Sequence, residues 1–318
     1  MVPGFISLRE RWVWREEGID TMKKCTVGFI GAGKVGTALA LQLLKAGYPV
    51  AAVFDLDINA AQELARLVPG CSVCNNAQEA ADQSEHVFIT TPDDFIWNVA
   101  SKLSWRPLQH VVHCSGAVSI DILGAAEQAG SLIGSFHPCQ AFASVEQAIH
   151  NLPGSTFAIE ARGDLMRTLQ DMASRMGGDS IVLKPGDKAL YHAAAVFVSN
   201  YVVTLLSIAT QLFENFGIQT AQATRILSPL MQGNLNNIKN IGLPDCLTGP
   251  IARGDLSTIQ NHIAAFRERQ PSLMRLYGEL GLKTIPIALA KGTIDQKAGE
   301  RLRELLKTAA ETENNSET

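Results

Sequence analysis

Residues 28–36 read GFIGAGKVG, and no other segment restricts the fold of this chain as strongly. An apolar run that predicts a strand is followed by glycines with the G-x-G-x-x-G spacing of a turn that opens a helix. Gly31 permits the tight turn, Gly33 lets the backbone approach a pyrophosphate, and Gly36 lets the helix pack closely on the strand. The helix N-terminus presents free amides and its positive dipole end, so the sequence predicts a βαβ unit that binds a dinucleotide. The loop residues expected at the cofactor are Gly31, Ala32, Gly33, Lys34, Val35 and Gly36.

Asp55 ends the next expected strand, where a carboxylate can bind the adenine ribose 2'-hydroxyl of a dinucleotide. The alternative is an ordinary solvated acid at a strand end. No Arg follows in residues 56–58 to receive a 2'-phosphate, which favours NAD over NADP. Lys34 argues in the other direction, because its ammonium could reach a phosphate. The sequence therefore predicts NAD or NADP as cofactor, with a slight preference for NAD.

Strand and helix patterns alternate from Cys25 to about residue 185, which is typical of a parallel sheet with crossover helices. The expected strands are 25–31, 49–55, 86–92, 110–116, 131–138, 155–161 and 181–186, with helices at 35–46 and 59–67. After Gly186 the pattern is helical, at 187–216, 220–240, 256–268, 270–282 and 294–310. We therefore predict an α/β fold, with a Rossmann-type doubly wound parallel sheet in residues 22–185 and an all-helical substrate and dimerisation domain in residues 186–310.

The two ends of the chain fit neither domain. Residues 1–21 carry too many charges for the apolar core of a signal peptide. They are expected to be a disordered extension, with the natural start at Met22. Residues 311–318 are polar and are expected to fray as a tail.

The composition limits the kinds of partner and the compartment. A formal net charge of -4 over 318 residues gives no basic field, so neither nucleic acid nor a membrane surface is an expected partner. Six cysteines are scattered through a chain without a secretory signal, which indicates free thiols in a reducing cytoplasm. Cys71 and Cys74 have CxxC spacing, but a zinc site would need a second pair and a redox motif would need a thioredoxin context. We expect a cytoplasmic protein without a metal site.

Residues 193–212 carry no formal charge and have the length of a membrane span. The segment also contains Ser199, Asn200, Thr204, Ser207, Thr210 and Gln211. This polarity favours a buried central helix of a large or dimeric core over a membrane span.

Three further strand ends are expected to face the same cleft as the glycine loop, since ligands of open α/β sheets bind at the carboxyl ends of the strands. The first two, residues 90–93 and 113–116, would line the nicotinamide and its ribose. The cofactor-binding residues expected there are Thr91, Pro92, Asp93, Ser115 and Gly116. His137 ends the third strand, where its ring either donates to a substrate oxygen or carboxylate or has only a structural role.

Lys188 and His192 stand four residues apart at the start of a long helix, on one face and about 6 Å apart along its axis. Asn200 continues this polar stripe. A lysine beside a cofactor cleft can donate a proton to a carbonyl as hydride adds, and the histidine can position the lysine or the substrate. The alternative is a solvated helix start with a histidine at the border of the core.

Residues 247–255 form a polar loop, LTGPIARGD, between two expected helices. Thr248 and Arg253 could clamp a carboxylate, because a guanidinium matches its two oxygens. Equally, Thr248 and Asp255 could only cap helices.

Several segments together resemble the bacterial Rossmann-like and DUF2520 domain-containing proteins. They are IGAGKVG, HCSGAVS, GSFHPCQAF, KALYHAAAVFVSNYVVTL and LTGPIARGD, and the resemblance covers Met22 to about Leu282. It implies membership of the 6-phosphogluconate-dehydrogenase-like superfamily, in which a Rossmann domain precedes a helical, usually dimer-forming domain. Members are described as NAD(P)-dependent oxidoreductases without an assigned substrate, and NADP is common in their relatives, which weakens the preference for NAD.

The related families imply roles for individual residues. In hydroxyacid enzymes of the superfamily a catalytic Lys is followed four residues later by Asn, and the matching pair here looks like Lys188 and His192. The pair His137 and Pro138 is similar to one in prephenate dehydrogenases, where the His meets substrate.

The resulting expectation is hydride transfer between NAD(P) and a small ketopantoate-like or hydroxyisobutyrate-like acid bound between the two domains. Lys188 would donate the proton, His192 and His137 would position the substrate, and a homodimer could supply Arg253 from a partner. The expected substrate-binding residues are Ser115, His137, Asn200, Thr248 and Arg253. The alternatives are an imine reductase, a prephenate-type dehydrogenase, or a redox sensor that binds dinucleotide without catalysis.

Overall fold

The structure is a computed structural model that describes residues 25–311. The disordered extension expected at residues 1–21 and all of the expected tail beyond Glu311 lie outside the described residues. The chain divides into two compact units, one ending at Val202 and the other beginning at Val203. The sequence placed the domain boundary between residues 185 and 186. The first compact unit ends later and therefore also contains the start of the long helix.

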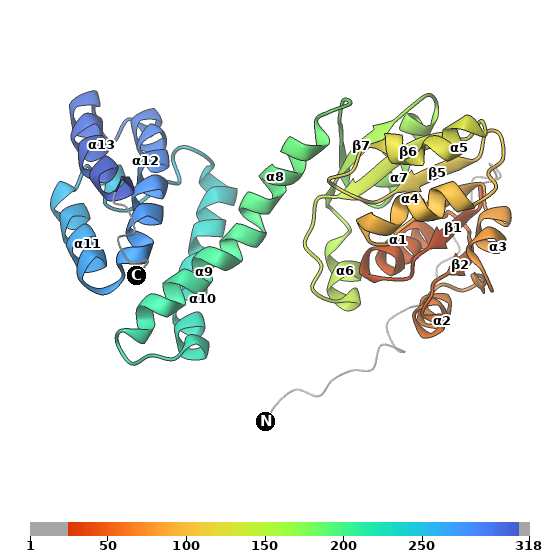
Figure 1. The fold of residues 1–318 in the computed structure, drawn as a ribbon, viewed down its shortest axis with the longest axis horizontal. Coiled ribbons are helices and arrows are strands. Elements are labelled where there is room, and N and C mark those ends of the chain that lie inside the picture. The colour runs from red at the N-terminus through yellow and green to blue at the C-terminus, as the bar shows by residue number, and fades with distance from the viewer. Residues whose placement is uncertain (1–24, 312–318) are drawn as a thin grey trace, which may run out of the picture. The chain divides into compact units, whose positions relative to one another are not determined.

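The first unit contains an eight-stranded sheet in the order β3-β2-β1-β4-β5-β6-β7-β8 (Figure 1). Its strands are β1 (Val27–Ile30), β2 (Val50–Phe54), β3 (Ser72–Val73), β4 (His86–Ile89), β5 (His110–His113), β6 (Leu132–Pro138), β7 (Thr156–Ala161) and β8 (Asp179–Val182). Strands β1 to β6 are parallel, as predicted.

The prediction of a wholly parallel sheet is wrong for the last two strands. β7 pairs antiparallel with β6, and β8 runs parallel to β7. The connection from β6 to β7 contains only the short helix α6 (Val145–Asn151), which packs on α1 (Lys34–Lys45), where Gln42 Nε2 donates to Ile149 O at 2.7 Å. The chain therefore does not cross back along the sheet. It enters β7 at the carboxyl end of β6, where Pro138 pairs with Phe157.

Helices cover both faces of this sheet, which confirms the doubly wound architecture. The further helices are α2 (Ile58–Leu67), α3 (Ala77–Asp82), α4 (Asp93–Lys102), α5 (Gly124–Gln128) and α7 (Leu165–Arg175). One core joins α1, α2, α6 and α7 through side chains such as Leu39, Leu64 and Leu169. The other core joins α3, α4 and α5 through side chains such as Ile96 and Ala126. Apolar burial on both faces makes the sheet a rigid floor for groups at its edges.

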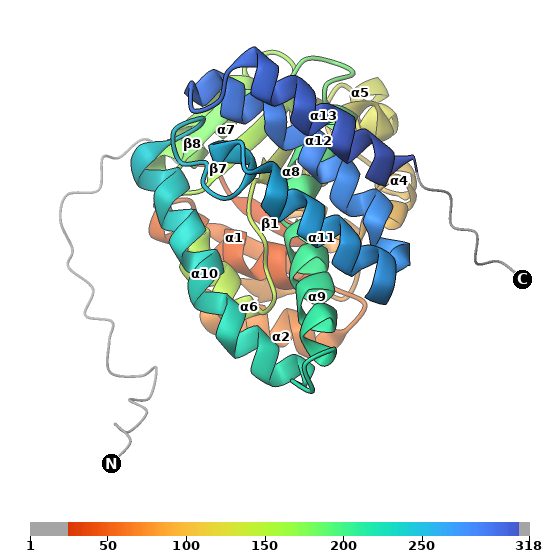
Figure 2. The same cartoon turned by 90° about the vertical axis from the view of Figure 1, so that its left-hand side faces the viewer.

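The second unit is helical, as predicted (Figure 2). It includes most of α9 (Asn200–Glu214), followed by α10 (Thr220–Ile241), α11 (Leu256–Arg269), α12 (Met274–Lys291) and α13 (Gln296–Ala310). Helices α12 and α13 pack closely because Gly281 leaves room for Leu306, whose Cδ2 would lie 2.7 Å from an added Cβ. The helix expected at 270–282 instead begins at Met274, after a 3-10 turn, and continues to Lys291.

The long helix expected at 187–216 is divided at Ser199 into α8 (Lys188–Val198) and α9. Over residues 188–214 it is long and apolar enough to cross a membrane, with a mean hydropathy of 1.7 in its most apolar window. The sequence favoured a buried central helix, yet large side chains along it are exposed in this chain. They include Leu190, Phe197, Val198, Tyr201, Val203 and Leu205. Within the described part of each unit, these side chains are therefore not buried as the sequence favoured.

Candidate functional site

The glycine loop after β1 has the geometry that its spacing predicts. Gly31 has φ +111°, and an added Cβ would lie 2.7 Å from the carbonyl carbon of Thr90, so only glycine fits there. A Cβ on Gly36 would lie 2.3 Å from Gly31 O, which shows how closely α1 packs on the strand. A Cβ on Gly33 would meet nothing within 4 Å, so this side of the loop is open. No side chain caps the N-terminus of α1, which leaves its first amides available to an anion.

Asp55 connects the end of β2 to the glycine loop. Its Oδ2 accepts a hydrogen bond from Ala32 N at 2.6 Å, and its Oδ1 accepts one from Asp57 N at 2.8 Å. The carboxylate is therefore more than a solvated strand-end acid, because it fixes the loop. A contact between the Asp55 carboxylate and the adenine ribose of a dinucleotide stays a prediction.

The ends of β4 and β5 lie beside this loop and are tied to it and to each other. Thr90 Oγ1 donates to Gly31 O at 2.6 Å, and Thr91 Oγ1 is buried with no partner among the described residues. Ser115 Oγ donates to Asp93 Oδ2 at 2.7 Å. Pro92 and Asp93 are exposed at the start of α4. The predicted nicotinamide-side residues are thus gathered at one edge of the sheet, with a free buried hydroxyl among them.

Lys188 is the buried cation of this edge. Its side chain is only 3% exposed, and Nζ donates to Ser115 O at 2.6 Å. Burial lowers the pKa of Lys188 to about 8, while the electrostatic influence of Glu160, Cys114 and Asp93 opposes that shift. An amine with this pKa can both give and take a proton near neutral pH.

His137 lies against Gly116 at the end of β6. An added Cβ on Gly116 would be 2.7 Å from His137 Nε2, so the ring packs directly on that backbone. His137 Nδ1 lies 2.8 Å from Tyr191 OH, and the His192 ring lies 6.4 Å away between centroids. Burial, with the charges of Lys188 and His192, lowers the pKa of His137 to about 4. The imidazole is therefore neutral near pH 7 and acts through hydrogen bonds.

The first unit thus brings together the glycine loop, Lys188, His192 and His137. Asn200 is not part of this cluster, since it lies twelve residues beyond Lys188, or roughly 18 Å along a helix. Its side chain hydrogen-bonds with Ser199 Oγ at 2.9 Å.

Thr248 and Arg253 belong to the second unit, and their roles in substrate binding stay predictions. Arg253 Nη2 lies 3.9 Å from Asp255 Oδ2. Asp255 caps α11 by accepting from Thr258 N at 3.1 Å, which confirms the capping alternative for that residue. Thr248 is exposed and begins no helix.

The sequence placed His113 at a strand end that faces the cleft, but it did not predict Glu160 or a polar row across three strands of the sheet. His113 on β5 pairs in register with Ser135 on β6, and Ser135 pairs with Glu160 on β7. All three side chains are buried, and His113 Nε2 and Ser135 Oγ have no partner among the described residues. The signal in the sequence was a charged residue inside the apolar run FAIEA. Tyr191 was missed too, although it lies only three residues beyond Lys188.

Within residues 25–311, no group of three or more His, Cys, Asp or Glu side chains is placed to hold a metal ion. The Cys71 thiol has its pKa raised to about 12, chiefly by burial and also by the charge of Cys74. A thiol with this pKa is a poor nucleophile and a poor metal ligand at neutral pH.

Comparisons with solved structures agree with the fold. A candidate NADP oxidoreductase from Bacteroides fragilis is 22% identical with a TM-score of 0.64, over 83% of this chain and 98% of that one. A reductive aminase from Aspergillus terreus, in complex with NADPH, is 15% identical with a TM-score of 0.58, over 90% of this chain and 94% of that one. At these identities the likeness shows a shared fold.

One curated relative matches over a short stretch. The 2-(hydroxymethyl)glutarate dehydrogenase from Eubacterium barkeri is 35% identical over 71 residues. The match spans 22% of this chain and 23% of that enzyme, so most of each protein lies outside it.

Family profiles assign both parts of the chain. Residues 15–138 match the Rossmann-like domain, and residues 155–284 match the domain of unknown function DUF2520. This order of domains confirms the resemblance drawn from the sequence. The chain therefore belongs to the Rossmann-like and DUF2520 domain-containing proteins.

Proposed function

We propose that this protein is an NAD(P)-dependent oxidoreductase that interconverts a small keto carboxylic acid and the corresponding hydroxy acid. The observation that carries the proposal is the buried Lys188, whose Nζ is hydrogen-bonded to Ser115 O at the sheet edge that also carries the glycine loop. A structural lysine would gain little from such burial, because desolvating an ammonium group is costly.

The residues at this edge fit a nicotinamide dinucleotide. The open side of Gly33 and the uncapped amides of α1 suit the pyrophosphate. When bound, the nicotinamide ring donates or accepts the hydride. Thr91 Oγ1 is a buried hydroxyl that a polar group of the cofactor would satisfy.

Lys188 supplies the proton that accompanies the hydride. In the reductive direction its ammonium donates to the carbonyl oxygen as negative charge develops there, and in the oxidative direction its amine accepts the hydroxyl proton. His137 is neutral and hydrogen-bonded to Tyr191, so it orients a substrate oxygen without adding charge. His192 stands beside it, and Ser115 lines the same edge.

Two observations bear on the substrate class. The curated relative acts, by its name, on a hydroxymethyl dicarboxylic acid, which supports a hydroxy acid here. Arg253 is the guanidinium that we propose as the partner of the substrate carboxylate, with Thr248 in the same loop. Imine reduction is the second candidate, because the same Lys188 could protonate an imine nitrogen and the reductive aminase shares this fold.

The choice between NAD and NADP depends on two residues with opposite effects. The Asp55 carboxylate at the end of β2 would repel a 2'-phosphate and favours NAD. Lys34 is exposed at the first position of α1 and would attract a 2'-phosphate, and two proteins that share the fold are described with NADP or NADPH. The NAD preference therefore has no support from these relatives.

A homodimer, in the cytoplasm, is also part of the proposal. Large apolar side chains are exposed along α8 and along α9, more of them than a soluble monomer usually leaves open. A second copy would cover these side chains. Lys188 would stay buried within the first unit of its own chain. Sedimentation velocity should give twice the mass of the chain, and Phe197→Glu with Val203→Glu should give the monomer. A detergent-dependent, membrane-bound protein would contradict this proposal.

The test of function starts with calorimetric titration of NADH and NADPH. An absorbance screen with the cofactor that binds then follows its oxidation by keto acids, including ketopantoate, and by pyrroline-5-carboxylate as the imine. Oxidation by a keto acid that is lost in Lys188→Ala supports the reductase. Turnover of the imine alone supports the second candidate. Binding without turnover supports a redox sensor, and no binding contradicts the proposal.

A further inference from the structure

Ser115 receives the Lys188 ammonium, and its own position is fixed by several contacts. Its carbonyl oxygen accepts a hydrogen bond from Lys188 Nζ at 2.6 Å. Its hydroxyl donates to Asp93 Oδ2 at 2.7 Å and accepts from Ala117 N at 3.2 Å and Val118 N at 3.1 Å. A hydroxyl has one proton to donate and two lone pairs, so these three contacts saturate it. The Ser115 side chain therefore holds the turn that follows β5.

His113, the last residue of β5, holds the backbone of Ser115. Its side chain is fully buried, and Nδ1 accepts a hydrogen bond from Ser115 N at 3.1 Å. A backbone amide can only donate, so Nδ1 is unprotonated and the neutral ring carries its proton on Nε2. Burial, with the electrostatic influence of Lys188 and His137, lowers the pKa of His113 to about 3, which agrees with a neutral ring. Nε2 has no partner among residues 25–311, so within them this ring makes its one hydrogen bond to Ser115.

Two hydrogen bonds thus join His113 to Lys188 through a single residue. Ser115 lies after β5 and before the 3-10 helix η2 (Ile120–Leu123), so among the described residues no strand or helix pairing fixes its carbonyl. The contacts of its side chain and the bond to His113 therefore determine where that oxygen points. The stem of a lysine is flexible, and an acceptor with a fixed position selects one of its conformers.

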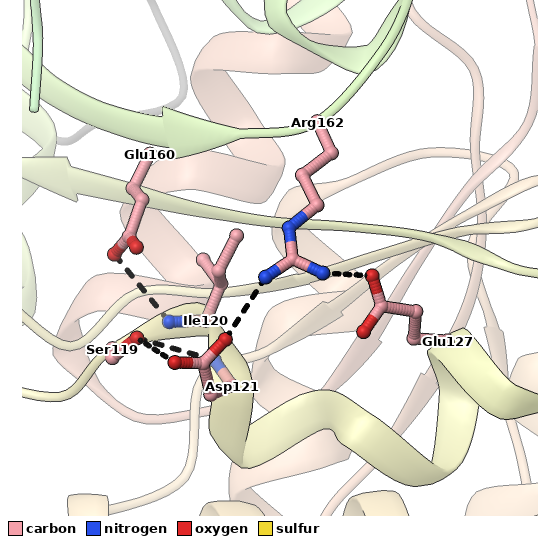
Figure 3. Close-up of polar contacts among 6 residues, drawn as sticks. All are labelled: Ser119, Ile120, Asp121, Glu127, Glu160 and Arg162. Carbon is pink, nitrogen blue, oxygen red and sulfur yellow. Dashed lines mark hydrogen bonds and ion pairs between the residues drawn. The ribbon is translucent and has the colours of Figure 1, made fainter. Parts of the chain in front are cut away.

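The far end of the same segment is anchored separately, where η2 begins. Arg162 comes just after β7, and its Nη2 lies 3.1 Å from Asp121 Oδ1 (Figure 3). Arg162 also pairs with Glu127 on α5 (Figure 3). The Arg162 and Asp121 side chains are 52% and 70% exposed, and ion pairs so exposed contribute little. The segment after β5 is thus held by a buried contact at one end and by an exposed one at the other.

We propose that His113 is a positioning residue for the proton donor, because its bond to the Ser115 amide directs the Ser115 carbonyl at Lys188 Nζ. The inference rests on the proposed function. A fixed Nζ matters because small displacements of a reacting group lower the rate strongly. His113 is fully buried, so it does not touch the substrate. It also exchanges no proton in the reaction, since a proton on Nδ1 would break the bond with Ser115 N.

Two substitutions of His113 separate the roles of its two ring nitrogens. The side-chain amide of asparagine reaches the place of Nδ1, whereas that of glutamine reaches the place of Nε2. His113→Asn therefore keeps an acceptor for Ser115 N, and His113→Gln removes it. Both variants are uncharged, as the native ring is. The other titratable groups that act on Lys188 stay unchanged in both variants, namely Glu160, Cys114, Asp93 and His137.

The first test needs no turnover, so its outcome is separate from that of the proposed function. The protein is labelled with trace acetic anhydride over a range of pH, and the reaction of Lys188 is followed by peptide mass spectrometry. In His113→Gln the ammonium loses a fixed acceptor, so the Lys188 pKa should fall by about one unit. His113→Asn should keep the native value. No shift in His113→Gln, or the same shift in both variants, overturns the proposal.

Two controls distinguish the bond to Ser115 from a general loosening of the fold. His86→Gln makes the same change in a buried histidine of β4 that contacts His110 instead. Arg162→Ala releases only the far end of the segment after β5. Both should leave the Lys188 pKa unchanged. A shift in either control as large as in His113→Gln would overturn the specific role of His113.

The second test uses the substrate that the absorbance screen identifies. His113→Gln should lower kcat about tenfold with KM nearly unchanged, and the pH above which reduction slows should fall with the Lys188 pKa. His113→Asn should restore most of kcat. A rise in KM with an unchanged pH profile would overturn the positioning role. Should His113→Gln fail to fold, Ser115→Ala carries both tests, because it removes the contact with Asp93 and should lower the Lys188 pKa in the same direction.

Discussion

The two ends of strands β4 and β5 both carry buried histidines, yet only one end has the character of an active site. At the amino end, His86 and His110 contact each other, with their Nδ1 atoms 2.7 Å apart, beside a cavity of about 270 Å³. At the carboxyl end, His113 lies beside Ser115, and His137 on the neighbouring strand contacts Tyr191. Burial lowers the pKa of His86 to about 4 and that of His113 to about 3, so titration alone does not distinguish the two ends.

The difference lies in what surrounds the rings. The amino-end pair satisfies itself, because one imidazole donates to the other. The carboxyl end adds a buried lysine and a glycine loop with an open side. It also has three buried polar atoms that have no hydrogen-bond partner among residues 25–311, namely Thr91 Oγ1, His113 Nε2 and Ser135 Oγ. A buried histidine by itself therefore indicates packing, whereas unpartnered polar groups around a buried cation indicate chemistry.

Matched glycine substitutions at the two ends should give the largest difference in cofactor binding. Gly31→Ala forces a Cβ to 2.7 Å from the Thr90 backbone at φ +111°, so it should weaken cofactor binding at least 100-fold in calorimetry. Gly130→Ala at the amino end has φ +87° but leaves 3.5 Å to Pro107. It should cost only about 1 kcal/mol of stability and leave cofactor affinity unchanged. Equal loss of affinity in both variants would mean that backbone strain anywhere disturbs the loop.

Lys188→Ala should reduce kcat by about 10²- to 10⁴-fold, because it removes the proton donor. The dissociation constant of the cofactor should stay the same, since the glycine loop is intact. Lys291→Ala is the control, because Lys291 is the last residue of α12 and donates to Asp245 O and Leu247 O in the second unit. Full activity in Lys188→Ala would remove the lysine from the mechanism.

The pH dependence of kcat should report the Lys188 ammonium. Reduction needs the protonated form, so it should be constant below the Lys188 pKa and fall tenfold per pH unit above about 8. Oxidation needs the amine and should rise over the same interval. Initial rates of reduction and of oxidation, measured across this pH range, show which reaction slows and which speeds up as the pH rises. A pH optimum shared by the two reactions would contradict Lys188 as the proton donor.

Tyr191→Phe should have a smaller effect, because it removes only the hydroxyl that contacts His137 Nδ1 at 2.8 Å. We expect KM for the substrate to rise about tenfold with a modest loss of kcat, consistent with the net strength of one hydrogen bond. Tyr277→Phe removes the equivalent hydroxyl from His262, also at 2.8 Å, in the second unit. That variant should leave both constants unchanged.

Substitution of His86 should leave turnover unchanged and alter only acid stability. Its folded-state pKa of about 4 lies below the ordinary value of 6.5, so the neutral ring contributes stability above pH 6.5 that is lost as pH falls towards 4. The loss should be on the order of 2 kcal/mol near pH 5. Urea unfolding near pH 7.5 and near pH 5 measures it, and His86→Gln should reduce the difference. A fall in kcat at constant stability would instead give the amino end a functional role.

Much of the fold was predictable from local patterns. The strands at 86–89 and 110–113 were expected because short apolar, β-branched runs are bounded by polar segments, and the helix at 220–241 because its apolar residues recur with helical spacing. The helix at 93–102 was not expected, since two aspartates after a proline, Asp93 and Asp94, are equally typical of a loop. The direction of β7 depends on α6 packing against α1, a contact between residues more than 100 positions apart.

The candidate site likewise has a part that the sequence predicts and a part that it does not. The glycine loop and the pair Lys188 and His192 follow from spacing within one element, so a single sequence can show them. Glu160 and Ser135 come together only through the pairing of β6 with β7, and strand pairing between distant segments has no local signal.

The reversed direction of β7 also determines which insertions and deletions the protein can tolerate. Residues 139–155 connect β6 to β7 outside the sheet, so a change of length there can be absorbed without moving the pairing of Ser135 with Glu160. A single deletion inside β7 would shift every following residue to the opposite face, because side chains alternate along a strand. Ile159 or Ala161 would then occupy the position of the acid. Natural variation in chain length should therefore be common in the connection and absent between Thr156 and Glu160.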